Sequence, residues 1–270
     1  MIAPARIQEV EFDFVPANET VIAETDPQFY DEDYFERGLI TGKSLYTNYR
    51  WLPELTLPLA HRIIRYLKIP PGSTVLDYGC AKGYLVKALR LLDINAWGFD
   101  ISEYALKSCD EDVRPYCTNQ LEDILVQNQN VIHYMIAKDV FEHMQPAEIY
   151  SLLTRLLPFI QNQILIIVPL GERGRYHIPA YQLDRSHVIA ENLDWWTHLF
   201  TTAGYQIHFA GTQLPGLKPN WEKVQNGNGF FIIAPKDARR MTMGLSISSQ
   251  ESFAKAQSRN DFGQNQYANP

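Results

Sequence analysis

The sequence has few cysteines, and their spacing argues against two kinds of scaffold. Among the 270 residues there are three cysteines, Cys80, Cys109 and Cys117, and no two of them form a CxxC pair. An odd, widely spaced set predicts neither a disulfide framework nor a zinc site. We therefore expect reduced thiols in a cytoplasmic protein, and the sequence leads us to assign no metal ligands.

Long apolar runs and an excess of positive charge are also missing. The longest apolar stretch, near QILIIVPL at residues 163–170, is far shorter than the roughly 20 residues that span a bilayer. The first residues lack the basic segment and apolar run of a secretion signal. The 31 acidic and 24 basic residues leave a net charge of -7, which argues against charge-driven binding to nucleic acid or an anionic membrane. We expect a soluble protein without either partner.

The hydrophobic residues, 46% of the chain, fall into short runs separated by amphipathic stretches between residues 73 and 235. This alternation is typical of parallel strands covered by helices on both faces. The last two runs are separated by a stretch too irregular for a crossover helix, which indicates an antiparallel final strand. The predicted fold is α/β, a doubly wound, mostly parallel seven-stranded sheet with the last strand antiparallel. The runs are TVLDY, AWGFDI, VRPYC, VIHYMIA, QILIIVP, YQIHFA and GFFIIAP.

Composition divides the chain into three parts. Residues 1–54 form an N-terminal extension, whose aromatic segment at residues 48–55 is either core or a lid that closes over a ligand. Residues 55–236 form the α/β domain, which starts with a helix predicted over residues 57–69. Residues 237–270 are rich in Ser, Gln and Asn with few apolar anchors, as is typical of a polar, flexible tail.

One turn, in the stretch VLDYGCAKGYL, lies where a ligand of an open α/β sheet binds. Gly79 and Gly83 bracket it, and Asp77 stands at the carboxyl end of the preceding strand. A phosphate loop would need Lys and then Ser or Thr after its last glycine, but Tyr84 and Leu85 follow Gly83. The dinucleotide spacing G-x-G-x-x-G is absent as well.

The position of Asp77 favours a cationic ligand, because its carboxylate would repel a pyrophosphate but suits an ammonium or sulfonium centre. S-adenosylmethionine carries both groups. Asp100 ends the second strand in GFDIS, where one carboxylate can accept both hydroxyls of a ribose. The alternative for each residue is a helix cap: Asp77 for the helix after Gly83, and Asp100 for the helix from Glu103, although Ser102 is the better cap there.

These motifs resemble the small-molecule branch of the class I S-adenosylmethionine-dependent methyltransferases. VLDYGCAKG matches the family's acidic–x–Gly–x–x–x–Gly signature, GFDIS its ribose-binding end, and IAKDVFEHM the segment after the fourth strand. DRSHV followed by WWTHLFTTAGY resembles the stretch before the sixth strand. The resemblance covers residues 55–235. It departs at Ala81, where many members have a third glycine; one extra methyl group should leave binding intact.

The resemblance implies S-adenosylmethionine as the cofactor and a role for each matched position. Asp77 and the backbone of Gly79 and Cys80 would face the methionine end. Asp100 would bind the ribose, and Ile101 would lie beside the adenine. Asn119 and Gln120 would contact the adenine amine, while Asp139 would face the methyl group or the substrate. The complete expected set is Asp77, Gly79, Cys80, Ala81, Gly83, Asp100, Ile101, Asn119, Gln120 and Asp139.

Methyl transfer from a sulfonium is an in-line displacement in which the protein chiefly supplies proximity. A base is needed only if the acceptor must lose a proton, and histidine suits that task near neutral pH. The candidates at the carboxyl edge of the sheet are His143, His177 and His187. We favour His187, with Asp184 three residues earlier to orient its ring, over His143, which would share a helix face with Asp139 if that segment is helical. The alternatives are a structural hydrogen bond for either histidine and a solvated helix face for Glu142 and His143.

The sequence therefore predicts a methyltransferase that acts on oxygen or nitrogen of a small-molecule or glycan-like acceptor. The alternative is a non-catalytic protein that keeps the fold as a scaffold and attaches to an assembly through its tail. A third reading is a different use of the cofactor, such as its decarboxylated or carboxylated derivatives.

Overall fold

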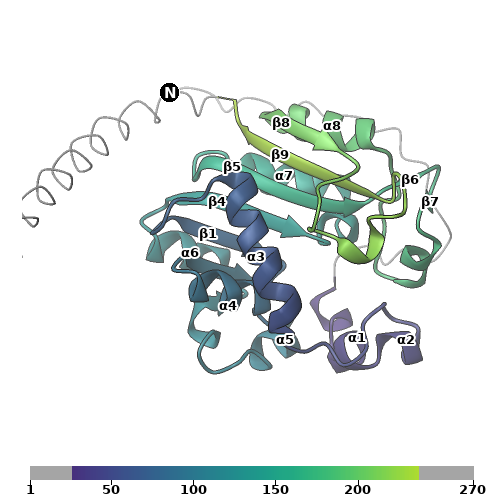
Figure 1. Ribbon diagram of the computed structural model, residues 1–270, viewed down its shortest axis with the longest axis horizontal. Coiled ribbons are helices and arrows are strands. Elements are labelled where there is room, and N and C mark those ends of the chain that lie inside the picture. Colours follow the sequence, from purple (N-terminus) through teal and green to yellow (C-terminus); the bar gives the residue numbers. More distant parts are fainter. Residues whose placement is uncertain (1–25, 237–270) are drawn as a thin grey trace, which may run out of the picture.

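A seven-stranded sheet organises residues 26–236, the part of the chain that the computed structural model describes. The strand order is β3-β2-β1-β4-β5-β9-β8, and β9 is antiparallel to both of its neighbours while the other pairs are parallel. This arrangement confirms the predicted fold (Figure 1). The strands are β1 (Thr74–Tyr78), β2 (Asn95–Phe99), β3 (Cys117–Thr118), β4 (Ile132–Lys138), β5 (Ile160–Pro169), β8 (Tyr205–Gly211) and β9 (Asn228–Pro235).

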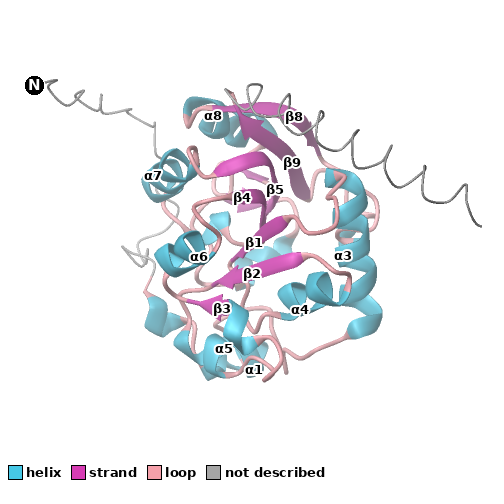
Figure 2. Cartoon of the chain, turned by 90° about the vertical axis from the view of Figure 1, so that its left-hand side faces the viewer, coloured by secondary structure: helices cyan, strands magenta, loops and turns pink. Residues whose placement is uncertain are grey.

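Helices cover both faces of the sheet, which is why the central strands are apolar without alternation. Every residue of β1 and of β9 is buried. Helices α3 and α4 lie on one face, and α6, α7 and α8 lie on the other (Figure 2). The helices are α1 (Glu32–Glu36), α2 (Gly38–Thr41), α3 (Pro53–Leu67), α4 (Tyr84–Leu91), α5 (Glu103–Lys107), α6 (Leu121–Gln127), α7 (Pro146–Leu156) and α8 (Leu193–Thr202).

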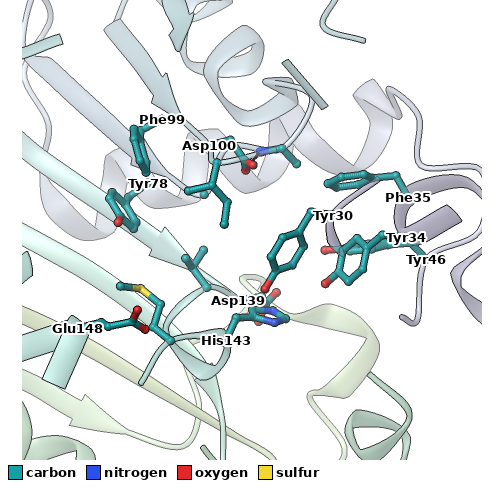
Figure 3. Close-up of a pocket in the computed structure, with 15 residues that line it drawn as sticks. Tyr30, Tyr34, Phe35, Tyr46, Tyr78, Phe99, Asp100, Asp139, His143 and Glu148 are labelled. Atoms are coloured by element: carbon teal, nitrogen blue, oxygen red, sulfur yellow. Dashed lines mark hydrogen bonds between the residues drawn. The ribbon is translucent and has the colours of Figure 1, made fainter. Parts of the chain in front are cut away.

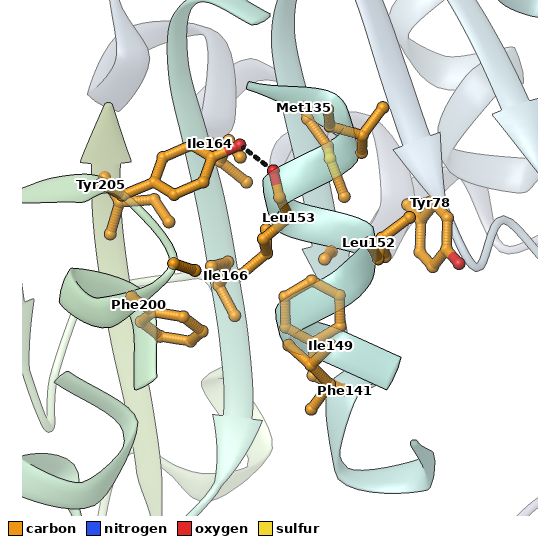
Figure 4. Packing of buried hydrophobic residues seen from close by; sticks show 14 of the residues in the cluster. Tyr78, Met135, Phe141, Ile149, Leu152, Leu153, Ile164, Ile166, Phe200 and Tyr205 are labelled. Atoms are coloured by element: carbon orange, nitrogen blue, oxygen red, sulfur yellow. Dashed lines mark hydrogen bonds between the residues drawn. The ribbon is translucent and has the colours of Figure 1, made fainter. Parts of the chain in front are cut away.

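Helix α7 shows how local signals and packing agree. Pro146 occupies the first turn, where its missing N–H costs nothing, and Gln145 and Glu148 form a capping box. The apolar stripe predicted from the sequence is buried against the sheet, including Ile149 and Leu153. The Tyr205 hydroxyl donates a 2.9 Å hydrogen bond to the Leu153 carbonyl, so β8 is tied to this helix (Figure 4).

Two predictions of local structure need correction. The run VRPYC is not a strand along its length: residues Arg114–Tyr116 form a 3-10 helix, and only Cys117–Thr118 pair as β3. Pro115 explains this, because it lacks the N–H that a strand ladder needs and suits a first helical turn. Helix α3 begins at Pro53, earlier than predicted, again with proline in its first turn. The short hairpin of β6 (Gly171–Glu172) and β7 (Arg175–Tyr176) was not anticipated.

The first described segment, residues 26–52, carries α1 and α2 and lies beside α5, below the sheet in the view of Figure 1. The polar tail expected at residues 237–270 lies outside the described residues, as do residues 1–25 of the N-terminal extension. Among residues 26–236, no helix is both long enough and apolar enough to cross a bilayer.

Candidate functional site

The turn between β1 and α4 has a backbone that favours glycine. Gly79 has a φ of +81°, and a Cβ there would collide with the Val140 side chain. Gly83 has a φ of +72° and caps α4. Ala81 also lies in the left-handed region, with a φ of +49°, which gives a physical reason for the glycine common at this position in the family it resembles. The amides of Gly79 and Cys80 donate to the Phe99 carbonyl at 2.7 and 3.0 Å. These two amides therefore form part of the wall of the site and are not available to donate hydrogen bonds to a ligand.

Asp77 is a buried carboxylate that faces a cavity at the end of β1. Its residue surface is 4% exposed, and no hydrogen bond to its carboxylate is found among the described residues. Burial raises its pKa from 3.8 to about 7, against the opposing charge of Lys138 and with a smaller contribution from Asp100. It does not cap α4, whose N-cap is Gly83. A buried carboxylate in this state is suited to receive a cation.

Asp100 ties the end of β2 to the turn after β1. Its two oxygens accept hydrogen bonds from the Ala81 amide at 2.7 Å and the Ser102 amide at 2.8 Å. Burial raises its pKa. The cap of α5 is Ser102, whose hydroxyl oxygen accepts from the Ala105 amide, so the capping alternative for Asp100 fails. Each carboxylate oxygen keeps a lone pair for a further donor.

Two cavities meet at this turn. The aromatic cavity, of about 310 Å³, contains Asp100 and Ile101 in its wall together with rings of Tyr30, Tyr34, Phe35, Tyr46, Tyr78 and Phe99 (Figure 3). The Asp77 cavity, of about 430 Å³, is lined by Asp77, Cys80, Tyr49 and Arg50 among others. Both are lined by Tyr46, Gly79, Ala81 and Asp139. An elongated ligand can therefore occupy both cavities and pass the turn at Gly79.

Residues 26–52 close the outer side of these cavities. Lys82 in the turn forms an ion pair with Glu36 of α1 and donates a 2.9 Å hydrogen bond to the Tyr49 carbonyl. Trp51 packs on the ring of Tyr84, with 5.8 Å between centroids. Within the aromatic segment at residues 48–55, Tyr49 and Arg50 line a cavity, while Trp51 packs against α4. Closure of this segment over a ligand stays a prediction.

Asp139 follows β4 and lies in the wall of both cavities. Its φ is +58°, and its carboxylate pairs with the ammonium groups of Lys138 and Lys218, each at 2.5 Å. Burial would raise its pKa, but the two lysines outweigh burial and hold the pKa below its usual range. Only Phe141–His143 form a 3-10 helix after it. The expected helix face shared by Asp139 and His143 therefore does not exist.

His143 is the histidine that reaches the aromatic cavity. Its Nδ1 lies 2.8 Å from the Ser186 hydroxyl, which in turn donates to Asp184 at 2.6 Å. The Tyr34 hydroxyl donates to the other Asp184 oxygen at 3.0 Å. Burial lowers the pKa of His143. Asp184 is thus connected to His143 through Ser186, a link that the sequence reasoning did not include.

His187 lies behind His143 and lines neither cavity. Its side chain is 6% exposed, and its ring centroid is 4.6 Å from that of His143. Nδ1 lies 2.9 Å from the Tyr181 carbonyl oxygen, while Nε2 is 4.0 Å from both Asp184 and Glu142. Burial, together with His143, lowers its pKa to about 3. Direct contact between His187 and an acceptor is therefore not supported by this geometry.

Glu142, next to His143, is a buried carboxylate that the sequence reasoning did not single out. It was considered for a solvated helix face, but it is 1% exposed, and its Oε2 has no hydrogen-bond partner among the described residues. Burial and the charge of Asp139 raise its pKa well above the usual value. The only available signal was its position beside His143 in VFEHM.

The other expected residues divide between two locations. Ile101 lines the aromatic cavity beside Asp100. Asn119 and Gln120 follow β3 as expected, but they are exposed, bond to each other at 3.3 Å and line neither of the two cavities. The three cysteines, Cys80, Cys109 and Cys117, are free thiols. Cys80 and Cys117 pack against Gly98, where a Cβ would come within 3.0 Å of either sulfur.

The chain was compared with known proteins. A family model described as "Methyltransferase domain" matches residues 51–208, whereas no curated protein matches the sequence. A S-adenosylmethionine-dependent methyltransferase from Archaeoglobus fulgidus superposes with a TM-score of 0.50 and 17% identity, over 67% of this chain and 94% of that one. Magnesium protoporphyrin IX methyltransferase from Synechocystis, with bound S-adenosylhomocysteine, superposes with a TM-score of 0.52 and 13% identity, over 78% and 98%. At these identities the structural likeness concerns the fold.

Proposed function

This chain belongs to the family of S-adenosylmethionine-dependent methyltransferase domains, and on that premise we propose that it methylates oxygen or nitrogen of a small-molecule or glycan-like acceptor. The observation that carries the cofactor part of the proposal is the pair of carboxylates at the ends of adjacent parallel strands, the buried Asp77 and the half-buried Asp100. They face two cavities that share a wall at Gly79 and Ala81. A cationic ligand that also carries a ribose fits this pair.

We place the methionine end of the cofactor in the Asp77 cavity. The cofactor's ammonium would pair with Asp77, whose burial makes its carboxylate a strong partner for a cation. The ribose hydroxyls would donate to Asp100, and the adenine would lie beside Ile101. Asn119 and Gln120 contribute to adenine binding only if the exposed edge after β3 moves toward the cavity.

The acceptor would occupy the end of the aromatic cavity where Tyr30, Asp139 and His143 lie (Figure 3). There the cofactor, when bound, would supply a methyl group to a lone pair on the acceptor oxygen or nitrogen, and its sulfur would leave as a neutral thioether. An acceptor hydroxyl would pass its proton to water. Aromatic walls around a cavity of about 310 Å³ would hold the reactants in line.

The residue we propose for direct contact with the acceptor is His143 rather than His187. His143 lines the cavity, and Ser186 connects it to Asp184. His187 lines neither cavity and supports His143 through ring contact. Residues 26–52 would act as a lid, because Lys82 joins them to the cofactor turn.

Calorimetry and a methyl-transfer assay test the proposal. We expect S-adenosylhomocysteine to bind with micromolar affinity and NAD not to bind. At 100 times its dissociation constant the ligand should add about 2.7 kcal/mol to the free energy of unfolding. Radiolabelled S-adenosylmethionine offered with panels of phenols, sugars and amines should label at least one acceptor class. Binding without turnover on any acceptor would favour the non-catalytic scaffold, and tight NAD binding would refute the cofactor assignment.

A further inference from the structure

Glu142, His143 and His187 form a cluster whose potential metal-ligand atoms all lie within 4.8 Å of one another. Two of the residues belong to the 3-10 helix after β4, and the third belongs to the loop before α8. The amides of Val188 and Ile189 both donate to the Glu142 carbonyl, at 2.8 and 3.3 Å. This backbone clamp holds the two segments together, so the three side chains are brought to one place before any ligand binds.

The second feature of the cluster is the buried carboxylate of Glu142. It is 1% exposed, and its Oε2 has no hydrogen-bond partner among residues 26–236. The nearby ammonium groups of Lys138 and Lys218 each lie 2.5 Å from Asp139. Burial of a carboxylate in this way is unfavourable unless a proton or another cation neutralises it.

The hydrogen bonds around the two histidines select the form of the ring that binds a metal. The Tyr181 carbonyl can only accept, so Nδ1 of His187 carries the proton and its Nε2 carries a lone pair. Nε2 lies 4.0 Å from Glu142 Oε1. The Ser186 hydroxyl donates to Asp184, so its oxygen accepts from Nδ1 of His143. Hydrogen bonds of this kind orient histidines that ligate metals.

We propose that Glu142, His143 and His187 bind one divalent transition-metal cation, of the class of Zn²⁺, Mn²⁺ and Co²⁺. Two imidazoles and one carboxylate suit these ions. Ligand atoms about 2.1 Å from a shared ion lie at most about 4.2 Å apart, so the 4.0 Å separation between His187 and Glu142 is within reach. Small side-chain rotations complete the set.

The cation has a chemical role at this position, and that role rests on the proposed methyl transfer. Three protein ligands leave a coordination position open. Because His143 lines the aromatic cavity, the cluster lies next to the wall of that cavity. An acceptor hydroxyl bound there loses its proton to water, because the cation lowers the hydroxyl pKa. The resulting oxygen attacks the methyl carbon as the carbon–sulfur bond breaks. His143 and His187 then serve as ligands rather than as bases.

Metal titration of the full chain tests the site without requiring turnover. Chelator-treated protein is titrated with Co²⁺ by absorption spectroscopy and with Zn²⁺ by calorimetry. We expect about one equivalent to bind, with a visible Co²⁺ spectrum typical of nitrogen and oxygen ligands. Glu142→Gln and His187→Gln should each weaken binding at least tenfold. The matched control is His177→Ala, which removes an exposed histidine from the same loop region and should bind as the wild type does.

Circular dichroism and S-adenosylhomocysteine binding identify any variant that fails to fold. Because Glu142→Gln is nearly isosteric, we expect this variant to fold. Absence of stoichiometric binding to the wild type, or equal binding by wild type and a folded Glu142→Gln, would overturn the inference. These results are separable from the proposed function. Metal binding that depends on Glu142 supports the site even if no acceptor is methylated, whereas chelator-insensitive methyl transfer without metal binding refutes the site and leaves the transferase.

Discussion

Cofactor affinity should rise with pH between 6 and 8, because the carboxyl of Asp77 must ionise to pair with the cofactor's ammonium. In the free protein burial raises the pKa of Asp77 to about 7. Below that pH the carboxyl is mostly neutral, and binding must expel its proton. Above it the carboxylate is already charged and the ammonium pairs with it directly.

The size of the effect follows from the pKa. A carboxyl with a pKa near 7 is about one tenth ionised at pH 6 and about nine tenths ionised at pH 8, so affinity should increase about tenfold, or about 1.4 kcal/mol. The same group affects the stability of the free protein in the opposite direction. Its folded pKa is above the ordinary value of 3.8, so its contribution is fully present below about pH 4 and is lost by up to about 4 kcal/mol as the pH rises through 7.

Calorimetric titration with S-adenosylhomocysteine at pH 6, 7 and 8 measures the affinity change. Repeating the pH 6 titration in buffers of different ionisation enthalpy measures the released proton. Asp77→Asn is the control: it should bind weakly at every pH, without proton release, and should unfold at a higher temperature than the wild type at pH 8. A pH-independent affinity in the wild type, or an unchanged pH slope in Asp77→Asn, would refute the reasoning.

Three further substitutions test other parts of the site. Asp100→Ala should weaken S-adenosylhomocysteine binding at least tenfold, since charged hydrogen bonds worth roughly 1.5 to 3 kcal/mol each are lost; unchanged affinity in calorimetry would restrict Asp100 to its bonds with the turn. Lys82→Met should weaken binding several-fold in the same assay, because it leaves the Glu36 carboxylate without its ion pair and loosens residues 26–52. Wild-type affinity in this variant would show that residues 26–52 do not act as a lid. His143→Ala should lower turnover roughly a hundredfold or more with cofactor affinity preserved, whereas a parallel loss of affinity would indicate a structural role.

The placement of Asp77 and Asp100 beside one turn could be predicted because it depends on local pattern and one general rule. Asp77 and Asp100 each end an apolar run, and the carboxyl ends of adjacent parallel strands meet at one edge of the sheet. The third strand was predicted less well. Its apolar run contains Pro115, which favours a 3-10 turn, and edge strands have only one partner to hold them extended.

The surroundings of His143 could not be predicted, because they are assembled by contacts between segments far apart in the chain. Asp184 stands three residues before His187, yet its hydrogen bonds connect it through Ser186 to His143. Glu142 sits in a short 3-10 helix whose burial depends on the loop that the Val188 amide attaches to it. Sequence spacing carries no information about such loop closure.

The sequence by itself determined the alternation of strands and helices in the main sheet, the reversal of the final strand, the glycine-dependent turn and the two carboxylates beside it. These features follow from hydrophobic periodicity and backbone preferences, which act over a few neighbouring residues. Only the tertiary structure decided which histidine reaches the cavity and that Lys82 joins residues 26–52 to the turn. It also decided that Glu142 is buried and that its Oε2 has no hydrogen-bond partner within residues 26–236. Those outcomes depend on burial and on hydrogen bonds across long loops, where the environment of a side chain is set by segments that its own neighbours do not specify.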